Sequence, residues 1–113
     1  MNLTLAEKDI YEQFEPRKDS LYFKVGMRGL VSFHSSIYHL KMRMSDEQRS
    51  RLMTDDTFVQ IAEDCYVNLT KITSIENDCL RFGDTPDSLS RVPVSKRKQQ
   101  ELRELLFDRR LKH

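Results

Sequence analysis

The chain has 113 residues, with 19 Lys plus Arg against 18 Asp plus Glu and only two cysteines. This length suits one domain with a modest core, so we expect a single domain over residues 1–113. The net charge of +1 excludes a simple polybasic binder. Two cysteines favour a reduced, cytoplasmic protein over a secreted one. The longest apolar run is three residues and no basic-then-apolar leader is present, so neither a membrane span nor a signal peptide is expected.

The charge is distributed unevenly along the chain. Residues 1–53 carry nine basic and seven acidic side chains, a net charge of +2. Residues 54–87 carry two basic and eight acidic side chains, a net charge of −6, and residues 88–113 carry eight basic and three acidic, a net charge of +5. Such a chain can present one positive and one negative face, although a solvated C-terminal helix is an equally open interpretation of the basic quarter.

The first third of the chain reads as β structure. Apolar residues before position 20 suggest one or two strands: Leu3, Leu5, Ile10 and Phe14. The runs Leu21–Val25 and Leu30–His34 flank a loop with two glycines, which predicts a hairpin. After a turn at Ser35-Ser36, apolar and polar residues alternate over Tyr38–Met44, which is typical of a half-buried strand whose outer face is basic.

A short helix is predicted next. Ser45 and Gln48 have the spacing of a capping box, with acidic residues between them in the first turn. The helix is expected to run to about Met53 and to be buried through Leu52 and Met53.

Four short runs rich in β-branched and aromatic residues follow, and they predict strands. They are Phe58–Ala62, Tyr66–Leu69, Ile72–Glu76 and Cys79–Phe82, with turns at Glu63-Asp64 and Asn77-Asp78. Gly83–Asp87 is expected to form a longer loop. Leu89–Val94 is the last predicted strand, and Pro93 argues for an edge position because it donates no hydrogen bond.

The C-terminal segment from Ser95 is helical in pattern. Ser95 is a good N-cap, and three leucines fall on one face of the helix: Leu102, Leu105 and Leu106. The run from Lys96 to Lys98 places positive charge where the helix dipole disfavours it. A bound anion would relieve this misfit, and screening by solvent and Glu101 is the plainer alternative.

Catalytic and metal-binding patterns are not evident, so we expect no enzyme, no cofactor and no metal. The sequence has no Walker loop, dinucleotide fingerprint or GxSxG elbow. Cys65 and Cys79 lack ligand spacing and are expected to be small core residues, Cys65 with a raised pKa beside Glu63 and Asp64. His34 and His39 could share a metal, but a partly exposed strand histidine is the commoner case.

Two stretches carry a family signature. The first runs from Phe58 to Ile75 and contains Val67-Asn68 ahead of an Ile-x-x-Ile strand. The second is Arg91-Val92-Pro93-Val94-Ser95-Lys96-Arg97, followed by an amphipathic helix. In this order and spacing they resemble the LytTR family of bacterial DNA-binding domains, and the similarity covers about residues 3–107.

The resemblance implies an elongated, mostly β fold with three small sheets, one or two short helices and a C-terminal amphipathic helix. It also implies that loops at the sheet edges enter successive major grooves, with a few side chains at base edges and many at phosphates. The sites in such families are usually paired direct repeats in promoter DNA.

The resemblance assigns DNA contacts to three loops. The first, Val25–Gly29, offers Lys24 and Arg28. The third offers Ser95, Lys96, Arg97 and Lys98. The family prefers Arg directly after the Ser, and here Lys96 stands there, so base readout falls to Arg97.

The second loop departs from the family pattern. The family usually places His and then Arg, Lys or Asn before a Ser, whereas this chain has Ala62-Glu63-Asp64. Carboxylates repel phosphates, although Glu63 can accept a hydrogen bond from cytosine N4. Gln60 can add hydrogen bonds to DNA.

The residues and the resemblance together predict a stand-alone transcription regulator that binds promoter DNA as a monomer or weak dimer, paired on its site. No receiver domain precedes the predicted fold, so control by a separate inhibiting or activating protein is expected. The alternative is a LytTR-like module that has lost sequence-specific DNA binding and acts through protein contacts. The acidic second loop is the feature that separates the two hypotheses.

Overall fold

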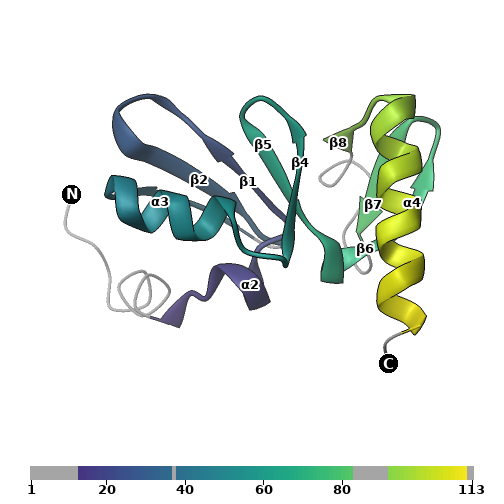
Figure 1. Ribbon diagram of the computed structural model, residues 1–113. Helices are drawn as coiled ribbons and strands as arrows, with labels where there is room; N and C mark the ends of the chain where they lie inside the picture. Colours follow the sequence, from purple (N-terminus) through teal and green to yellow (C-terminus); the bar gives the residue numbers. More distant parts are fainter. Residues whose placement is uncertain (1–12, 37, 83–91, 112–113) are drawn as a thin grey trace.

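The structure is a computed structural model that describes residues 13–36, 38–82 and 92–111. The molecule measures 44 × 31 × 28 Å along its principal axes, so it is elongated, as expected. Two β-sheets lie side by side along the long axis, and each carries a packed helix (Figure 1). The predicted mostly β class with a C-terminal amphipathic helix is therefore confirmed.

The larger sheet has five antiparallel strands in the order β3-β2-β1-β5-β4. These are β1 (Tyr22–Val25), β2 (Leu30–His34), β3 (His39–Arg43), β4 (Phe58–Ala62) and β5 (Cys65–Asn68). The two predicted hairpins, β1–β2 and β4–β5, are joined because β1 also pairs with β5, with Tyr22 opposite Val67. This pairing fuses them into one sheet, so the described residues form two sheets and not the three that the resemblance implied.

The smaller sheet has three strands in the order β6-β7-β8, and α4 packs along it. These elements are β6 (Ile72–Glu76), β7 (Cys79–Phe82), β8 (Val92–Pro93) and α4 (Lys96–Leu111). The edge position predicted for Pro93 is confirmed, since β8 pairs only with β7 within the described ranges. The remaining helical segments are α2 (Pro16–Asp19), η1 (Met27–Gly29), α3 (Asp46–Met53) and η2 (Leu69–Lys71).

Local sequence signals explain where the elements begin and turn. At the start of α3 the Ser45 hydroxyl accepts a 3.1 Å bond from the Gln48 amide, and Gln48 Oε1 accepts a 2.9 Å bond from the Ser45 amide. The predicted capping box is therefore confirmed. Asn77 and Asp78 have φ angles of 51° and 61°. Left-handed values at both central positions suit the tight turn between β6 and β7.

Two hydrophobic cores hold the molecule together. The first lies between the larger sheet and α3, where Phe23 stacks on Tyr66 and meets Phe58 edge to face, each at a centroid distance of 4.9 Å. The second lies between β5, the smaller sheet and α4, and its fully buried members are Val67, Leu80, Phe82 and Leu102. Each sheet thus has its own core, and β5 contributes to both.

Some expectations were wrong in detail. Met53 is 38% exposed, because only Leu52 at the end of α3 faces the aromatic core. Phe14 lies in no strand, and it packs edge-on against Phe33 at 5.1 Å. Cys79 is half-buried, whereas Cys65 is buried as expected. The predictions for Leu3, Leu5, Ile10 and residues 83–91 concern positions outside the described residues.

The junction of the two sheets is organised by the buried amide of Asn68. Its Nδ2 donates to the carbonyl oxygens of Arg17 at 2.9 Å and Ser20 at 2.8 Å. Its Oδ1 accepts from the amide of Thr70 at 3.0 Å and from the Thr70 hydroxyl at 2.6 Å. All four hydrogen-bonding positions of the amide are therefore used. They connect the segment before β1 to the segment that leads into the smaller sheet.

Replacement of Asn68 by Ala is expected to destabilise the fold by about 3 kcal/mol, because two carbonyls lose their donor inside the protein. Thr70→Ala is the matched control, since it removes a single bond at an exposed residue and is expected to cost about 1 kcal/mol or less. Urea denaturation followed by circular dichroism measures both. Equal midpoints for the two variants would contradict the role given to Asn68.

Candidate nucleic-acid interface

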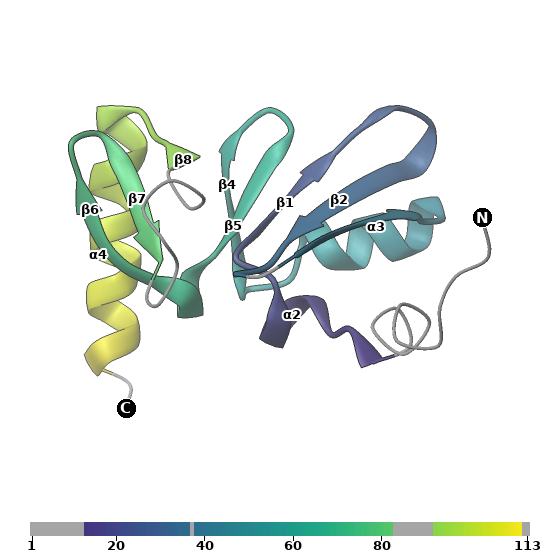
Figure 2. The ribbon, with the colours of Figure 1, turned by 180° about the vertical axis from the view of Figure 1, so that it is seen from behind.

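Three connections that the sequence singled out reach the same edge of the molecule. They are the β1–β2 tip (residues 26–29), the β4–β5 tip (Glu63 and Asp64) and the turn from β8 into α4 (Val94 and Ser95). Opposite views place all three at the upper edge, in a row along the long axis (Figures 1 and 2). The β6–β7 turn lies at this edge too, beside the start of α4. A surface of this shape can meet an elongated partner at several points at once.

The β1–β2 tip presents an arginine in an unusual backbone conformation. Arg28 has a φ of 58° and is exposed, and Met27 beside it is 82% exposed. Gly29 follows with a φ of 79°, so the loop has one of its two glycines in the left-handed region. Lys24, which was expected in this loop, lies instead within β1 and is exposed on the sheet. Arg28 is therefore the cation carried by the tip itself.

The β1–β2 tip is anchored to the start of α3. The Gly29 carbonyl accepts a 2.8 Å bond from the amide of Met44. The Met44 carbonyl in turn accepts a 3.0 Å bond from Arg49 Nη1, and Arg49 also pairs with Asp46. Sequence reasoning found the cap of α3 but not this support, because Arg49 reads as an ordinary exposed helix residue.

The β4–β5 tip carries two exposed carboxylates. Gln60 Nε2 donates a 3.1 Å bond to the Glu63 carbonyl, across an irregularity in the β4–β5 pairing. The Asp64 carbonyl accepts a 2.9 Å bond from the Val25 amide. Gln60, expected to bond to DNA, thus holds the turn in shape. The charge of Glu63 and Asp64 faces outward between two basic loops.

The start of α4 presents two uncompensated cations. Ser95 caps the helix, accepting a 3.3 Å bond from the Lys98 amide, as predicted. Lys98 Nζ lies 3.0 Å from Glu101 Oε2, so its charge is offset. Lys96 and Arg97 are exposed, and within the described part of the chain they form no ion pair. These two, at the helix terminus with its positive dipole, form the strongest positive point of this edge.

A buried glutamine, which sequence reasoning missed, locks the start of α4 to the β6–β7 turn. Gln99 Nε2 donates to Asp78 Oδ1 at 2.9 Å and to the Val94 carbonyl at 3.0 Å. The Asp78 carbonyl also accepts a 2.9 Å bond from the Val94 amide. A glutamine in a charged helical stretch gives no signal of burial, so only the fold identifies this contact.

The residues considered for catalysis or metal binding are His34, His39 and Cys65. The rings of His34 and His39 stack with centroids 5.5 Å apart, and no cluster of three metal-ligating residues occurs among the described residues. Burial raises the pKa of the Cys65 thiol to about 11, and Asp64 adds to this rise against an opposing effect of Lys24. Cys65 is therefore a thiol at neutral pH and a poor nucleophile. No helix in the described ranges is long and apolar enough to cross a membrane.

The structure is an elongated module of two β-sheets, with cations at the two outer loops of one edge and carboxylates at the loop between them. The profile of the LytTr DNA-binding domain matches residues 15–107. The chain belongs to the LytTR family of DNA-binding domains. It is thus a DNA-binding domain of the type used in bacterial transcription regulation, from a family that is not enzymatic.

A solved structure has the same fold. It is the LytTr DNA-binding domain of a putative methyl-accepting/DNA response regulator from Bacillus cereus, with a TM-score of 0.56 and 22% sequence identity. The alignment covers 81% of this chain and 84% of that chain. No curated protein sequence matches this chain.

Gly29→Ala is expected to destabilise the β1–β2 tip by about 2 kcal/mol, because alanine is strained at a φ of 79° and its Cβ would lie 2.8 Å from the Met44 carbonyl oxygen. Gly26→Ala is the matched control in the same loop. Its φ of −101° suits alanine, and its Cβ would lie 3.3 Å from the Leu30 carbonyl oxygen. Thermal denaturation compares the two variants, and an equal loss of stability would contradict this account of the tip.

Proposed function

We propose that this protein is a stand-alone transcription regulator that binds duplex promoter DNA through the upper edge of the two sheets. The observation that carries the proposal is the position of three cations at this edge that form no ion pair among the described residues. Arg28 lies at one outer tip, and Lys96 and Arg97 lie at the other. In the proposed complex Arg97 and Arg28 reach base edges or phosphates, and Lys96 contacts phosphate as a point charge.

The dimensions of the molecule support contacts in successive major grooves. The long axis measures 44 Å, and one turn of B-DNA spans about 34–36 Å. The molecule as a whole is therefore slightly longer than one helical turn, which allows its two outer tips to approach successive major grooves on the same side of a duplex. The carboxylates of Glu63 and Asp64 then face the segment between the two grooves. There they repel phosphates and lower affinity for DNA that lacks the matching outer contacts.

We further propose a paired arrangement of binding sites and control by a second protein. Binding sites are expected to be paired direct repeats, each occupied by one protomer, with no requirement for a dimer before DNA binding. A second, separate protein is expected to control the regulator. The stand-alone character is tested by the size of the native protein on an immunoblot of the source cells, and the pairing by stoichiometry on duplexes with one or two repeats.

The central test is a salt series on a duplex selected from a random library, with affinity measured by fluorescence anisotropy. Lys96→Ala/Arg97→Ala is expected to weaken binding at least tenfold and to reduce the log–log salt slope by about 1.8, since each phosphate contact contributes about 0.9. Lys18→Ala/Lys71→Ala is the charge-matched control. Lys18 lies in α2 and Lys71 in η2, both away from the upper edge, so little change is expected.

Glu63→Asn is expected to strengthen binding by about three- to tenfold at low salt, because it removes a charge that repels phosphate. If the variant instead lost its preference for the selected site, Glu63 would be a base reader that accepts from cytosine N4. A weak, salt-independent response of the unaltered protein on every duplex would favour the alternative function, a regulator that acts through protein contacts.

A further inference from the structure

Among the described residues, one face of the larger sheet is uncovered along β2 and β3 and around Lys24 of β1, while Tyr22 of β1 packs against Phe82 of the smaller sheet. The opposite face of these strands packs on α3 through Phe23, Val31 and Phe33. On the uncovered face, every described side chain of β3 that points outward is basic or imidazole: His39, Lys41 and Arg43, all exposed. Lys24 of β1 is exposed on the same face. We call this surface the basic face, defined by Lys24, His34, His39, Lys41 and Arg43.

The strand register brings these residues into adjoining rows. Ser32 lies opposite both Lys24 and Lys41, so the two lysines flank a small residue across three strands. The next row has His34 opposite His39, two residues or about 6.6 Å further along the strands. Arg43 lies opposite Leu30, two residues from Lys41 in the opposite direction along β3. Three long cationic side chains and two imidazoles thus share one flat surface.

Nothing within the three strands neutralises this charge. The sequences of β1, β2 and β3 contain no Asp or Glu. Lys24, Lys41 and Arg43 form no ion pair within the described residues. Burial lowers the pKa of His34, and the charges of His39, Lys24 and Lys41 lower it further. Like charges gathered without counter-charges favour an anionic partner.

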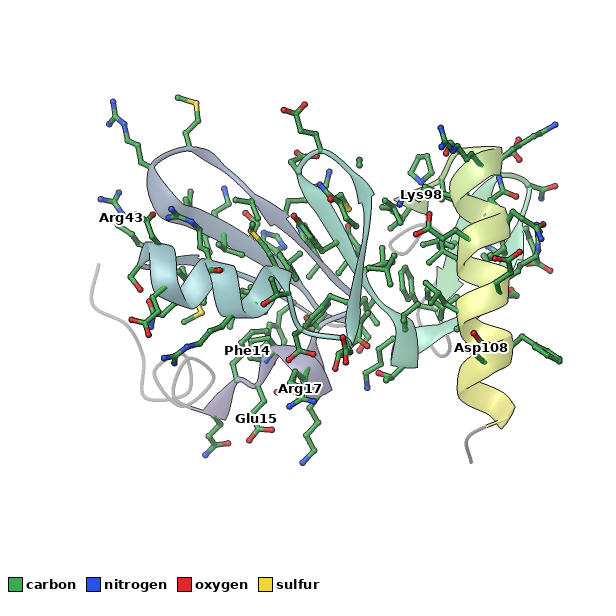
Figure 3. All side chains as sticks on the ribbon, viewed as in Figure 1. Phe14, Glu15, Arg17, Arg43, Lys98 and Asp108 are labelled. Carbon is green, nitrogen blue, oxygen red and sulfur yellow. The ribbon has the colours of Figure 1, made fainter. Side chains whose placement is uncertain are left out.

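The basic face is continuous with the DNA-binding edge. Arg43 pairs with Leu30, the first residue after the β1–β2 tip, and the next amide, Met44, bonds to Gly29 in the tip. Arg43 projects from the end of the molecule that carries this tip, and Lys98 marks the far end of the same edge (Figure 3). An anion that reaches the tip can therefore continue onto the basic face.

We propose that the basic face binds the phosphate backbone of the same duplex, outside the base pairs that the β1–β2 tip reaches. The inference rests on the proposed DNA-binding function and adds a lateral contact to it. Lys41 and Arg43 are the principal phosphate contacts, and Lys24 lies across β2 from Lys41, farther from the β3 edge of the sheet. The contact requires DNA that extends past the tip on the β3 side, which distinguishes it from the contacts of the three loops.

The test compares two duplexes, one that ends at the base pairs reached by the β1–β2 tip and one extended there by about ten base pairs. Lys41→Ala/Arg43→Ala is expected to weaken binding to the extended duplex about tenfold and to lower its salt slope by about 1.8, with little change on the short duplex. Arg97→Ala is expected to weaken binding to both duplexes. Lys18→Ala/Lys71→Ala again serves as the charge-matched control.

A second readout follows the imidazole of His34 by NMR. The His34 ring lies in the row beside Lys41, and it stacks on the Tyr22 ring with the two centroids 4.4 Å apart. The charged or titratable groups that face it are His39, Lys24 and Lys41. A phosphate on the basic face favours the imidazolium, so the extended duplex is expected to raise the pKa of His34 and the short duplex to leave it unchanged.

The outcomes separate the two proposals. If the unaltered protein binds neither duplex, the proposed function fails and the lateral contact fails with it. If Arg97→Ala weakens binding but Lys41→Ala/Arg43→Ala changes neither duplex, the lateral contact is overturned and the proposed function stands. If Lys41→Ala/Arg43→Ala lost the same affinity for both duplexes, the contact would not lie outside the base pairs that the β1–β2 tip reaches, and the proposal would be overturned. The face would instead be assigned to a membrane if Lys41→Ala/Arg43→Ala lost binding to phosphatidylserine vesicles and left DNA binding unchanged.

Discussion

The buried amide of Asn68 is the interaction on which the arrangement of this domain depends. It ends β5 in the larger sheet and caps η2, which leads into the smaller sheet. Its two donated bonds hold the chain just before β1. The strands β1, β5 and β6 therefore all begin or end near the Asn68 amide, whose hydrogen-bonding positions are all used. Because the β1–β2 and β4–β5 tips belong to hairpins that adjoin this junction, the relative positions of these two tips are set at the opposite edge of the molecule.

Each of the two outer tips has its own set of supporting hydrogen bonds. Arg28 sits beside a glycine held by Met44 and Arg49, and the Lys96–Arg97 pair begins a helix fastened by Gln99 to Asp78. These bonds use backbone carbonyls and one carboxylate, and they leave Arg28, Lys96 and Arg97 without an ion pair among the described residues. Holding the backbone beside a cation without neutralising the charge preserves the attraction of the cation for phosphate and reduces the loop entropy lost on binding.

Local elements were predictable from the sequence because short-range rules govern them. The capping box at Ser45, the alternation over residues 38–44 and the Asn77-Asp78 turn all depend on neighbours within a few positions. The pairing of β1 with β5 was not predictable, because it joins residues more than 40 positions apart and leaves no periodic signal. The same limit hid the structural roles of Gln60 and Gln99, since a polar side chain shows its partner only after folding.

The arrangement of cations and carboxylates along the upper edge gives the small net charge of the chain a physical explanation. At physiological salt, charges act over only about 8 Å, so a chain with a net charge of +1 attracts DNA weakly from afar. In the proposed complex its cations act at contact, at the two outer tips, while Glu63 and Asp64 repel phosphates between them. A duplex that engages one tip alone gains little and still meets the carboxylates. Discrimination between specific and non-specific DNA then grows at the expense of total affinity, because the repulsion is offset only where both outer tips are engaged.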